Sequence, residues 1–127
     1  MADNILTPEL LNEVYSSLKT YIEEHYAPGE ARYFFLKSRK KILPYFQQLE
    51  QITVDDEGQV HLSAQQLDDG LTLAFAVWMQ QFIKELHSEL IGFPLPDIEA
   101  LTEAHRQPLE AAGFYEFFRQ ASELEYE

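Results

Sequence analysis

The sequence contains no cysteine, and this absence excludes several kinds of chemistry at once. Without thiols the chain cannot form disulfides, hold a metal or iron–sulfur cluster through thiolates, or use a cysteine nucleophile. Glycine is also scarce, and its five positions are each more than ten residues from the next: Gly29, Gly58, Gly70, Gly92 and Gly113. Loops that bind phosphate or a dinucleotide need clustered glycines, because backbone N–H groups must approach the anion closely. The sequence therefore does not favour a nucleotide-binding protein.

Long hydrophobic runs are missing as well. The most apolar stretch, residues 71–79, is interrupted by Thr72 and is much shorter than the roughly 20 residues of a membrane-spanning helix. Asp3 and Asn4 stand where a secretory signal carries basic residues, and no apolar segment with a cleavage site follows them. We therefore expect a cytoplasmic protein that does not bind the membrane.

Positive charge is scarce and unevenly placed. The chain has 22 Asp and Glu but only 9 Lys and Arg, which gives a net charge of −13. Such a field repels nucleic acids, because binding to phosphates requires Lys and Arg that displace counterions. We therefore expect no direct nucleic-acid binding. Residues 32–41 hold no acid and five of the cations, namely Arg32, Lys37, Arg39, Lys40 and Lys41.

The hydrophobic content is sufficient for one core. The 127 residues are 46% hydrophobic and include 9 Phe, 7 Tyr and 1 Trp, so aromatic packing is expected to supply most of the core. The patterns predict a mainly α protein, a single-domain bundle of four to five helices with one short β-hairpin around residues 52–62. We expect one acidic helical domain over residues 1–127, frayed at residues 1–6 and 124–127.

Helical periodicity is clearest in the first half of the chain. Thr7 and Pro8 are typical of a helix start, and the first helix is expected to end at the Pro28-Gly29 pair. A second helix is predicted from residue 30 to about residue 51, where Pro44 either kinks the helix or splits it in two. Short β-branched runs around the 55–58 turn then predict the hairpin.

The second half of the chain predicts three more helical segments. The third helix opens at Ser63 or at Asp69 and should be central, because residues 71–79 are apolar on almost every side. A polar face is expected to resume at Gln80, Gln81, Lys84 and Ser88. Asp97 is expected to cap a fourth helix that reaches about residue 106, and residues 108–124 contain a fifth that Gly113 breaks or bends.

Two residues are candidates for a pocket or a pH-sensitive contact. His25 falls near the middle of the apolar stripe of the first helix, where it is either a hydrogen-bonded structural histidine or a titratable group that contacts a ligand. Trp78 either packs in the core or lines an apolar pocket. We predict no catalytic residue, metal ligand or cofactor. No histidine has a Glu, Asp or His three positions before it, no two histidines are four residues apart, and no serine lies in a nucleophile elbow.

The functional prediction therefore rests on the distribution of charged residues. The first hypothesis is a small non-enzymatic adaptor or regulatory module that docks another protein on the five cations of residues 32–41. The structural alternative is that these cations relieve self-repulsion by pairing with neighbouring carboxylates, with Arg39 the most buried. A second hypothesis is an inhibitor, immunity protein or nucleic-acid mimic that uses the acidic surface. A third hypothesis is a small-ligand carrier or enzyme with an apolar pocket between helices. The sequence is also compatible with a homo-oligomer.

Overall fold

The computed structural model describes residues 6–27, 29–57, 59–63 and 68–123. These residues form a mainly helical domain with one two-stranded hairpin, which confirms the predicted fold class. The elements in chain order are α1 (Pro8–His25), α2 (Glu30–Ile42), the 3₁₀ helix η1 (Gln47–Gln51), β1 (Ile52–Val54), β2 (Val60–Leu62), α3 (Asp69–Glu89), α4 (Ile98–Leu101), the 3₁₀ helix η2 (Glu103–His105), α5 (Arg106–Ala111) and α6 (Phe114–Ala121).

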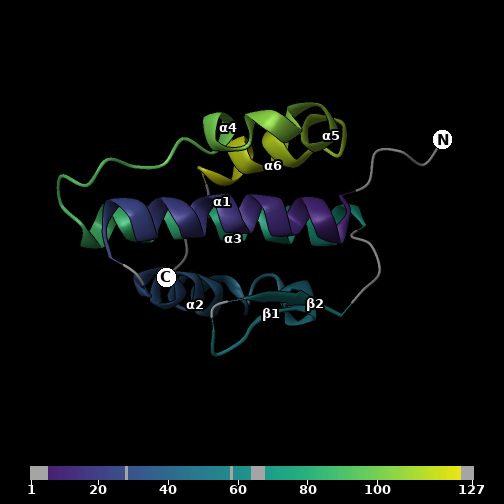
Figure 1. Ribbon diagram of the computed structural model, residues 1–127. Coiled ribbons are helices and arrows are strands. Elements are labelled where there is room, and N and C mark those ends of the chain that lie inside the picture. The colour runs from purple at the N-terminus through teal and green to yellow at the C-terminus, as the bar shows by residue number, and fades with distance from the viewer. Residues whose placement is uncertain (1–5, 28, 58, 64–67, 124–127) are drawn as a thin grey trace.

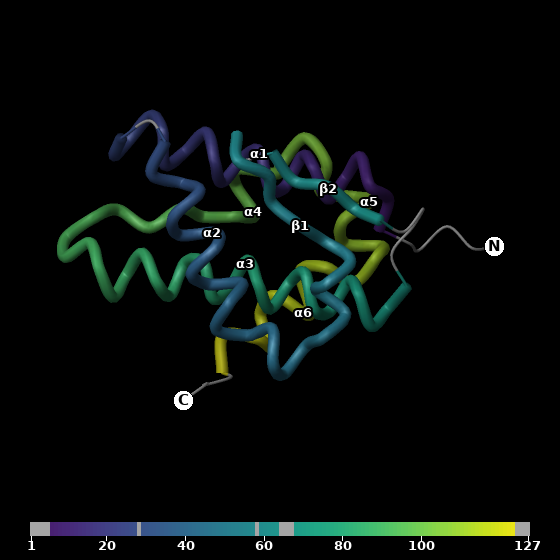
Figure 2. Tube along the Cα trace, turned by 90° about the horizontal axis from the view of Figure 1, so that it is seen from below, coloured from purple at the N-terminus to yellow at the C-terminus, as the bar shows by residue number. Residues whose placement is uncertain are grey.

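Helix α3 is the centre of the molecule. In Figure 1, α4, α5 and α6 lie on one side of α3, while α2 and the hairpin lie on the opposite side. The view of Figure 2, from below, shows α2 crossing over α3 and the hairpin lying between α3 and α1, which β2 contacts. Residues 71–79 are almost fully buried, as their unbroken apolar composition predicts.

Helix α1 begins where the sequence predicts. The N–H of Leu10 donates to Thr7 Oγ1 at 3.2 Å, which satisfies one of the free donors of the first turn. Leu6 precedes this cap and packs in the same core as Leu11, at the spacing of a hydrophobic staple. Leu6 is completely buried, although fraying was expected up to this residue, whereas residues 1–5 and 124–127 lie outside the described part of the chain.

The second predicted helical segment is split at Pro44, which is one of the two outcomes that the sequence left open. Pro44 has no N–H to bond to the carbonyl of Lys40, and its ring crowds that carbonyl, so α2 ends at Ile42. The chain then turns into η1, which leads directly into β1. Tyr45, which lies in this turn, is 55% exposed.

The hairpin forms where the sequence predicts it. Ile52 pairs with Leu62 and Val54 with Val60 in an antiparallel ladder. Asp55 closes the turn, since its Oδ1 accepts the N–H groups of Glu57 and Gln59, each at 2.9 Å. Gly58, expected to allow this turn, lies outside the described residues.

Helix α3 uses the later of its two predicted starts. The N–H of Leu71 donates to Asp68 Oδ1 at 2.8 Å, so Asp68 is the N-cap, while residues 64–67 of the earlier candidate lie outside the described part of the chain. The polar face predicted beyond residue 80 is only partly exposed. Gln81 is buried along with Glu85, and Gln81 Nε2 donates to Glu85 Oε2 at 2.7 Å. Packing of α2 and α6 on α3 buries positions that would face solvent on an isolated helix.

The C-terminal third contains three short α-helices rather than two. Asp97 caps α4 as predicted, but α4 ends at Leu101, and η2 separates it from α5. Gly113 breaks the last segment as expected, and its φ of +83° is a left-handed conformation that disfavours other residues. The Thr102 hydroxyl fastens α4 to α6, since it lies 2.7 Å from the Ile98 carbonyl oxygen and 2.6 Å from the Tyr115 hydroxyl.

Aromatic rings join α1, α2 and α3 in the core. Phe35 of α2 stacks between Tyr15 of α1 and Phe82 of α3, with ring centroids 4.1 Å apart in each pair. Trp78 is completely buried, and its Nε1–H donates to the Phe35 carbonyl at 3.0 Å and to Ser38 Oγ at 3.1 Å. Ser38 Oγ–H donates back to the Phe35 carbonyl at 3.1 Å. Trp78 is therefore a core residue and not part of a pocket.

This hydrogen-bond network predicts that two serines contribute differently to the free energy of unfolding. Ser38→Ala removes a buried partner of the indole N–H and should lower the free energy of unfolding by about 1–2 kcal/mol. Ser17 also donates to the carbonyl one helical turn before it, at 2.8 Å, but it is partly exposed and no indole depends on it. Ser17→Ala is the control and should be close to neutral, because alanine is the better helix former. Urea denaturation measures both, and equal losses would contradict the assignment.

Candidate functional site

The outward face of α2 carries the candidate docking surface. Two shallow, open depressions lie side by side there and share Lys37 and Lys40. The first is lined by Gly29, Arg32, Tyr33, Leu36, Lys37 and Lys40. The second is lined by Lys37, Lys40, Lys41, Glu85 and Ser88. We call the α2 residues Arg32, Tyr33, Leu36, Lys37, Lys40 and Lys41 the basic surface.

Arg32 ties α2 to the hairpin. Its Nε–H donates to the Asp55 carbonyl oxygen at 2.8 Å, and its Nη2 lies 3.4 Å from Asp56 Oδ1. The Asp55 side chain is held in turn by His61, whose Nε2 lies 2.7 Å from Asp55 Oδ2. This hydrogen bond from His61, together with those from the turn N–H groups, lowers the pKa of Asp55. The charge of Arg32, which belongs to the basic surface, thus already binds the hairpin.

Arg39 is the most deeply committed of the five cations. Its Nε–H donates to the Ile52 carbonyl at 2.8 Å and its Nη2–H to the Leu49 carbonyl at 2.9 Å. Partial burial lowers the pKa of Arg39, an effect that the charge of Glu50 opposes. Burial was expected for Arg39, but the hydrogen-bond partners are backbone carbonyls rather than carboxylates. Arg39 therefore fixes the turn from η1 into β1.

Lys37 joins α2 to the end of α3. Its Nζ forms an ion pair with Glu89 and lies 3.8 Å from Glu85 Oε1. The hydrogen bond with Glu89 raises the pKa of Lys37 and lowers the pKa of Glu89. Tyr33 adds a hydrogen bond from its hydroxyl to Glu89 Oε1 at 3.1 Å. Because the Glu85 side chain is only 8% exposed, it needs this cation nearby.

Lys40 and Lys41 differ from the other three cations. Both are exposed, and neither forms an ion pair with any residue that the structure describes. Lys40 lines one depression together with Tyr33, which is 49% exposed, and the half-buried Leu36. An exposed tyrosine and an aliphatic side chain beside cations are typical of protein interfaces, where apolar contacts supply affinity and charges supply specificity. The segment thus combines three structural cations with two available ones.

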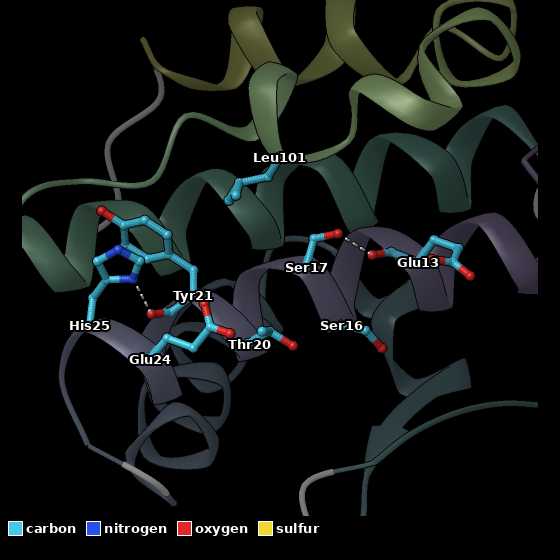
Figure 3. Close-up of a pocket in the computed structure, with 8 residues that line it drawn as sticks. All are labelled: Glu13, Ser16, Ser17, Thr20, Tyr21, Glu24, His25 and Leu101. Atoms are coloured by element: carbon cyan, nitrogen blue, oxygen red, sulfur yellow. Dashed lines mark hydrogen bonds between the residues drawn. The ribbon is translucent and has the colours of Figure 1, made fainter.

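His25 lies at the end of α1 on an exposed depression (Figure 3). His25 keeps the angle of the apolar stripe, but its ring is exposed because the last turn of α1 extends past the core. The ring stacks on Tyr21 with centroids 4.1 Å apart, and Nδ1 lies 3.0 Å from the Tyr21 carbonyl oxygen. Ser17 in the same depression donates to the Glu13 carbonyl, and Figure 3 shows it well apart from His25. This depression holds no nucleophile paired with a base.

Trp78 lines none of the depressions formed by the described residues, since its ring is wholly inside the core. Within the described ranges, no group of three or more His, Asp or Glu side chains is arranged to hold a metal ion. The helices described here include none with the length and apolar character needed to cross a membrane.

Comparison of the chain with protein-family models, with curated proteins and with solved structures finds no match. The function must therefore be argued from the side chains themselves.

The two carbonyl contacts of Arg39 predict that a positive charge at this position is not sufficient for full stability of the fold. Arg39→Lys keeps the charge but cannot donate to both carbonyls from one rigid fork, so we expect a loss of about 1–3 kcal/mol in the free energy of unfolding. The reverse change at an available cation, Lys41→Arg, is the control and should leave stability unchanged. Thermal and urea denaturation give the comparison. A full retention of stability by Arg39→Lys would show that only the charge matters.

The lowered pKa of Asp55 predicts a pH-dependent contribution of the hairpin turn. A carboxyl whose pKa is lower in the folded protein stabilises the fold above its unfolded value, near 3.8, and loses this contribution as the pH falls through its folded value. Asp55→Asn should therefore be less stable than the parent protein at pH 6, and the difference should shrink below about pH 3.8. Urea denaturation across pH tests this, with the exposed neighbour Glu57→Gln as the control. A difference that persists unchanged at low pH would contradict the role of the charge.

Proposed function

We propose that this protein is a small, non-enzymatic protein-binding module, an adaptor or regulator, that docks an acidic region of a partner protein on the basic surface of α2. The observation that carries the proposal is the exposed pair Lys40 and Lys41, which forms no ion pair with the described residues. Lys40 lines one depression with Tyr33 and Leu36, and both lysines line the other. The shallow, open form of the two depressions suits another protein surface better than an enclosed small molecule.

The charge of the remaining chain makes such docking selective. Outside residues 32–41 the chain carries 22 acidic and 4 basic residues. An acidic partner is therefore repelled by most of the molecule and attracted by one face of one helix, which limits the orientations in which the two proteins meet. Burial of Tyr33 and Leu36 would then supply the apolar part of the affinity.

The alternative functions have less support. A nucleic-acid mimic needs a continuous acidic face, but exposed carboxylates occur on α1, on the hairpin turn and on the helices from α4 to α6. Some of them are also paired within the chain, as Glu99 is with Arg106 and Arg119. A carrier or enzyme with an apolar pocket needs an enclosed cavity, whereas Trp78, expected in its wall, packs wholly within the core.

Loss of the two available charges should weaken partner binding. For the double variant Lys40→Gln/Lys41→Gln we expect about a tenfold loss of affinity, because two exposed ion pairs contribute about 0.2–1 kcal/mol each and also steer association. The control double variant Lys19→Gln/Arg119→Gln makes the same change in net charge away from α2 and should bind normally. Affinity capture with quantitative mass spectrometry identifies proteins that the parent and the control retain and the first variant loses, and titration then measures each affinity.

Salt provides a second criterion for the same partners. Their binding should weaken between low and physiological ionic strength, since the contacts are exposed and screened over about 8 Å. Partners that are retained equally by all three proteins, or that bind without salt dependence, would count against the basic surface as the docking site.

A further inference from the structure

The turn that follows α3 exposes an isoleucine almost completely. The N–H of Phe93 donates to the Leu90 carbonyl at 3.1 Å, and of the two central residues only Gly92 has a positive φ, +81°, which makes this a type II turn. Ile91 is the other central residue and is 97% exposed. Proline is common at its position in type II turns, so the turn itself does not require an aliphatic side chain there.

Two exposed tyrosines connect this turn to the basic surface. Tyr33 and Tyr26 both meet the ring of Phe34 edge-on, with ring centroids 5.0 Å and 6.5 Å from it. Tyr26 also meets the half-buried Phe93 of the turn, at 6.1 Å between centroids. The exposed fractions of Tyr33 and Tyr26 are 49% and 48%. We call Tyr26, Tyr33, Ile91 and Phe93 the apolar strip, of which Tyr33 also belongs to the basic surface.

The end of α3 holds the apolar strip beside the lysines. Glu89 accepts a hydrogen bond from the Tyr33 hydroxyl at 3.1 Å and forms an ion pair with Lys37. Ile91 follows Glu89 by only two residues. Lys37 Nζ lies 5.7 Å from the centroid of the Tyr33 ring. A ligand that covers Tyr33 therefore meets the apolar strip on one side and the lysines on the other.

We propose that the basic surface and the apolar strip together bind one short segment of a partner protein, in which acidic residues accompany an aliphatic or aromatic residue. This inference rests on the proposed function and names the apolar part of the ligand. Single exposed apolar side chains are common, whereas apolar side chains that adjoin one another inside a charged rim are typical of interfaces. The rim here is formed by lysines of an otherwise acidic chain, so the complementary segment carries carboxylates.

Helical geometry gives the spacing expected in this segment. Lys40 follows Tyr33 by seven residues, so the two lie on the same side of α2 and about 10 Å apart along its axis. An extended segment covers this distance in about three residues and a helical segment in about seven. A carboxylate on Lys40 and an apolar side chain on Tyr33 therefore belong about three positions apart in an extended ligand, or about seven in a helical one.

A library of random peptides of about 12 residues, displayed on phage, tests this chemistry without a known partner. Selection on the immobilised full chain at low salt should enrich peptides with Asp or Glu and an aliphatic or aromatic residue at one of these two spacings, relative to the unselected library. Enrichment of acidic peptides without such an apolar residue, of apolar peptides without an acid, or of no peptide would each overturn the inference.

Titration of the most enriched peptide separates this inference from the proposed function. We expect about tenfold weaker binding by Ile91→Gln, because an aliphatic contact is lost, and by Lys40→Gln/Lys41→Gln. Leu101→Gln makes the same kind of change at a partly exposed position of α4 and should bind normally. A loss confined to the lysine variant would overturn the joint surface and leave the proposed function intact, whereas unchanged binding by the lysine variant would contradict both.

Two other occupants of the apolar strip are tested directly. Light scattering of the purified chain detects a second copy, and sedimentation with phosphatidylserine vesicles detects binding to an anionic membrane. We expect a monomer that does not sediment with the vesicles. A dimer, or vesicle binding, that Ile91→Gln abolishes would assign the apolar strip to that occupant and would overturn the proposal.

Discussion

The packing of α2 on α3 determines both the core and the exposed surface of this protein. Phe35 stacks on Phe82, and its carbonyl accepts the indole N–H of Trp78, so one face of α2 is fixed inward. A helix that buries one stripe must present its other residues outward. The cations of residues 32–41 lie between those stripe positions in the sequence, and the same contact that completes the core places them on the surface.

The excess of negative charge limits what these cations can do. In a chain with a net charge of −13, a cation lowers self-repulsion wherever it stands. Lys37 does so in the most demanding place, because Glu85 is almost buried and Gln81 alone would leave it without a countercharge. Lys40 and Lys41 have no such role among the described residues. The proposed docking of acidic residues is therefore confined to the part of α2 that the fold does not itself require.

Local patterns in the sequence predicted the elements well where one signal dominates. Thr7, Asp97 and Gly113 each affect only the backbone next to them, and each has its predicted effect. The apolar run of residues 71–79 also predicted the central helix, because no other arrangement hides so many apolar side chains.

Predictions that depend on tertiary neighbours were less accurate. The burial of Gln81 could not be predicted because it depends on the packing of α2 and α6 on α3, a contact that the periodicity of a single helix does not contain. The exposure of His25 has a similar origin, since its angle on α1 suits the core but its position lies beyond the core's end. The sequence alone did not decide whether Pro44 kinks the helix or breaks it. The early turn that η1 makes into β1 decides for the break.

Helical phase explains why one basic segment serves two purposes. Arg32 and Arg39 are seven residues apart, so they lie on the same side of α2, and both donate to backbone carbonyls at the hairpin and its approach. Lys37 precedes Lys40 by three residues and Lys41 by four, so these lysines lie on a different face of α2 from the two arginines. The residue types fit this division, because the rigid guanidinium fork can hold two fixed acceptors while the lysine ammonium acts as a point charge on a long stem. Pairing with the protein itself and docking a partner are therefore not alternatives for the segment as a whole, because the two arginines and Lys37 pair within the protein while Lys40 and Lys41 form no ion pair with the described residues.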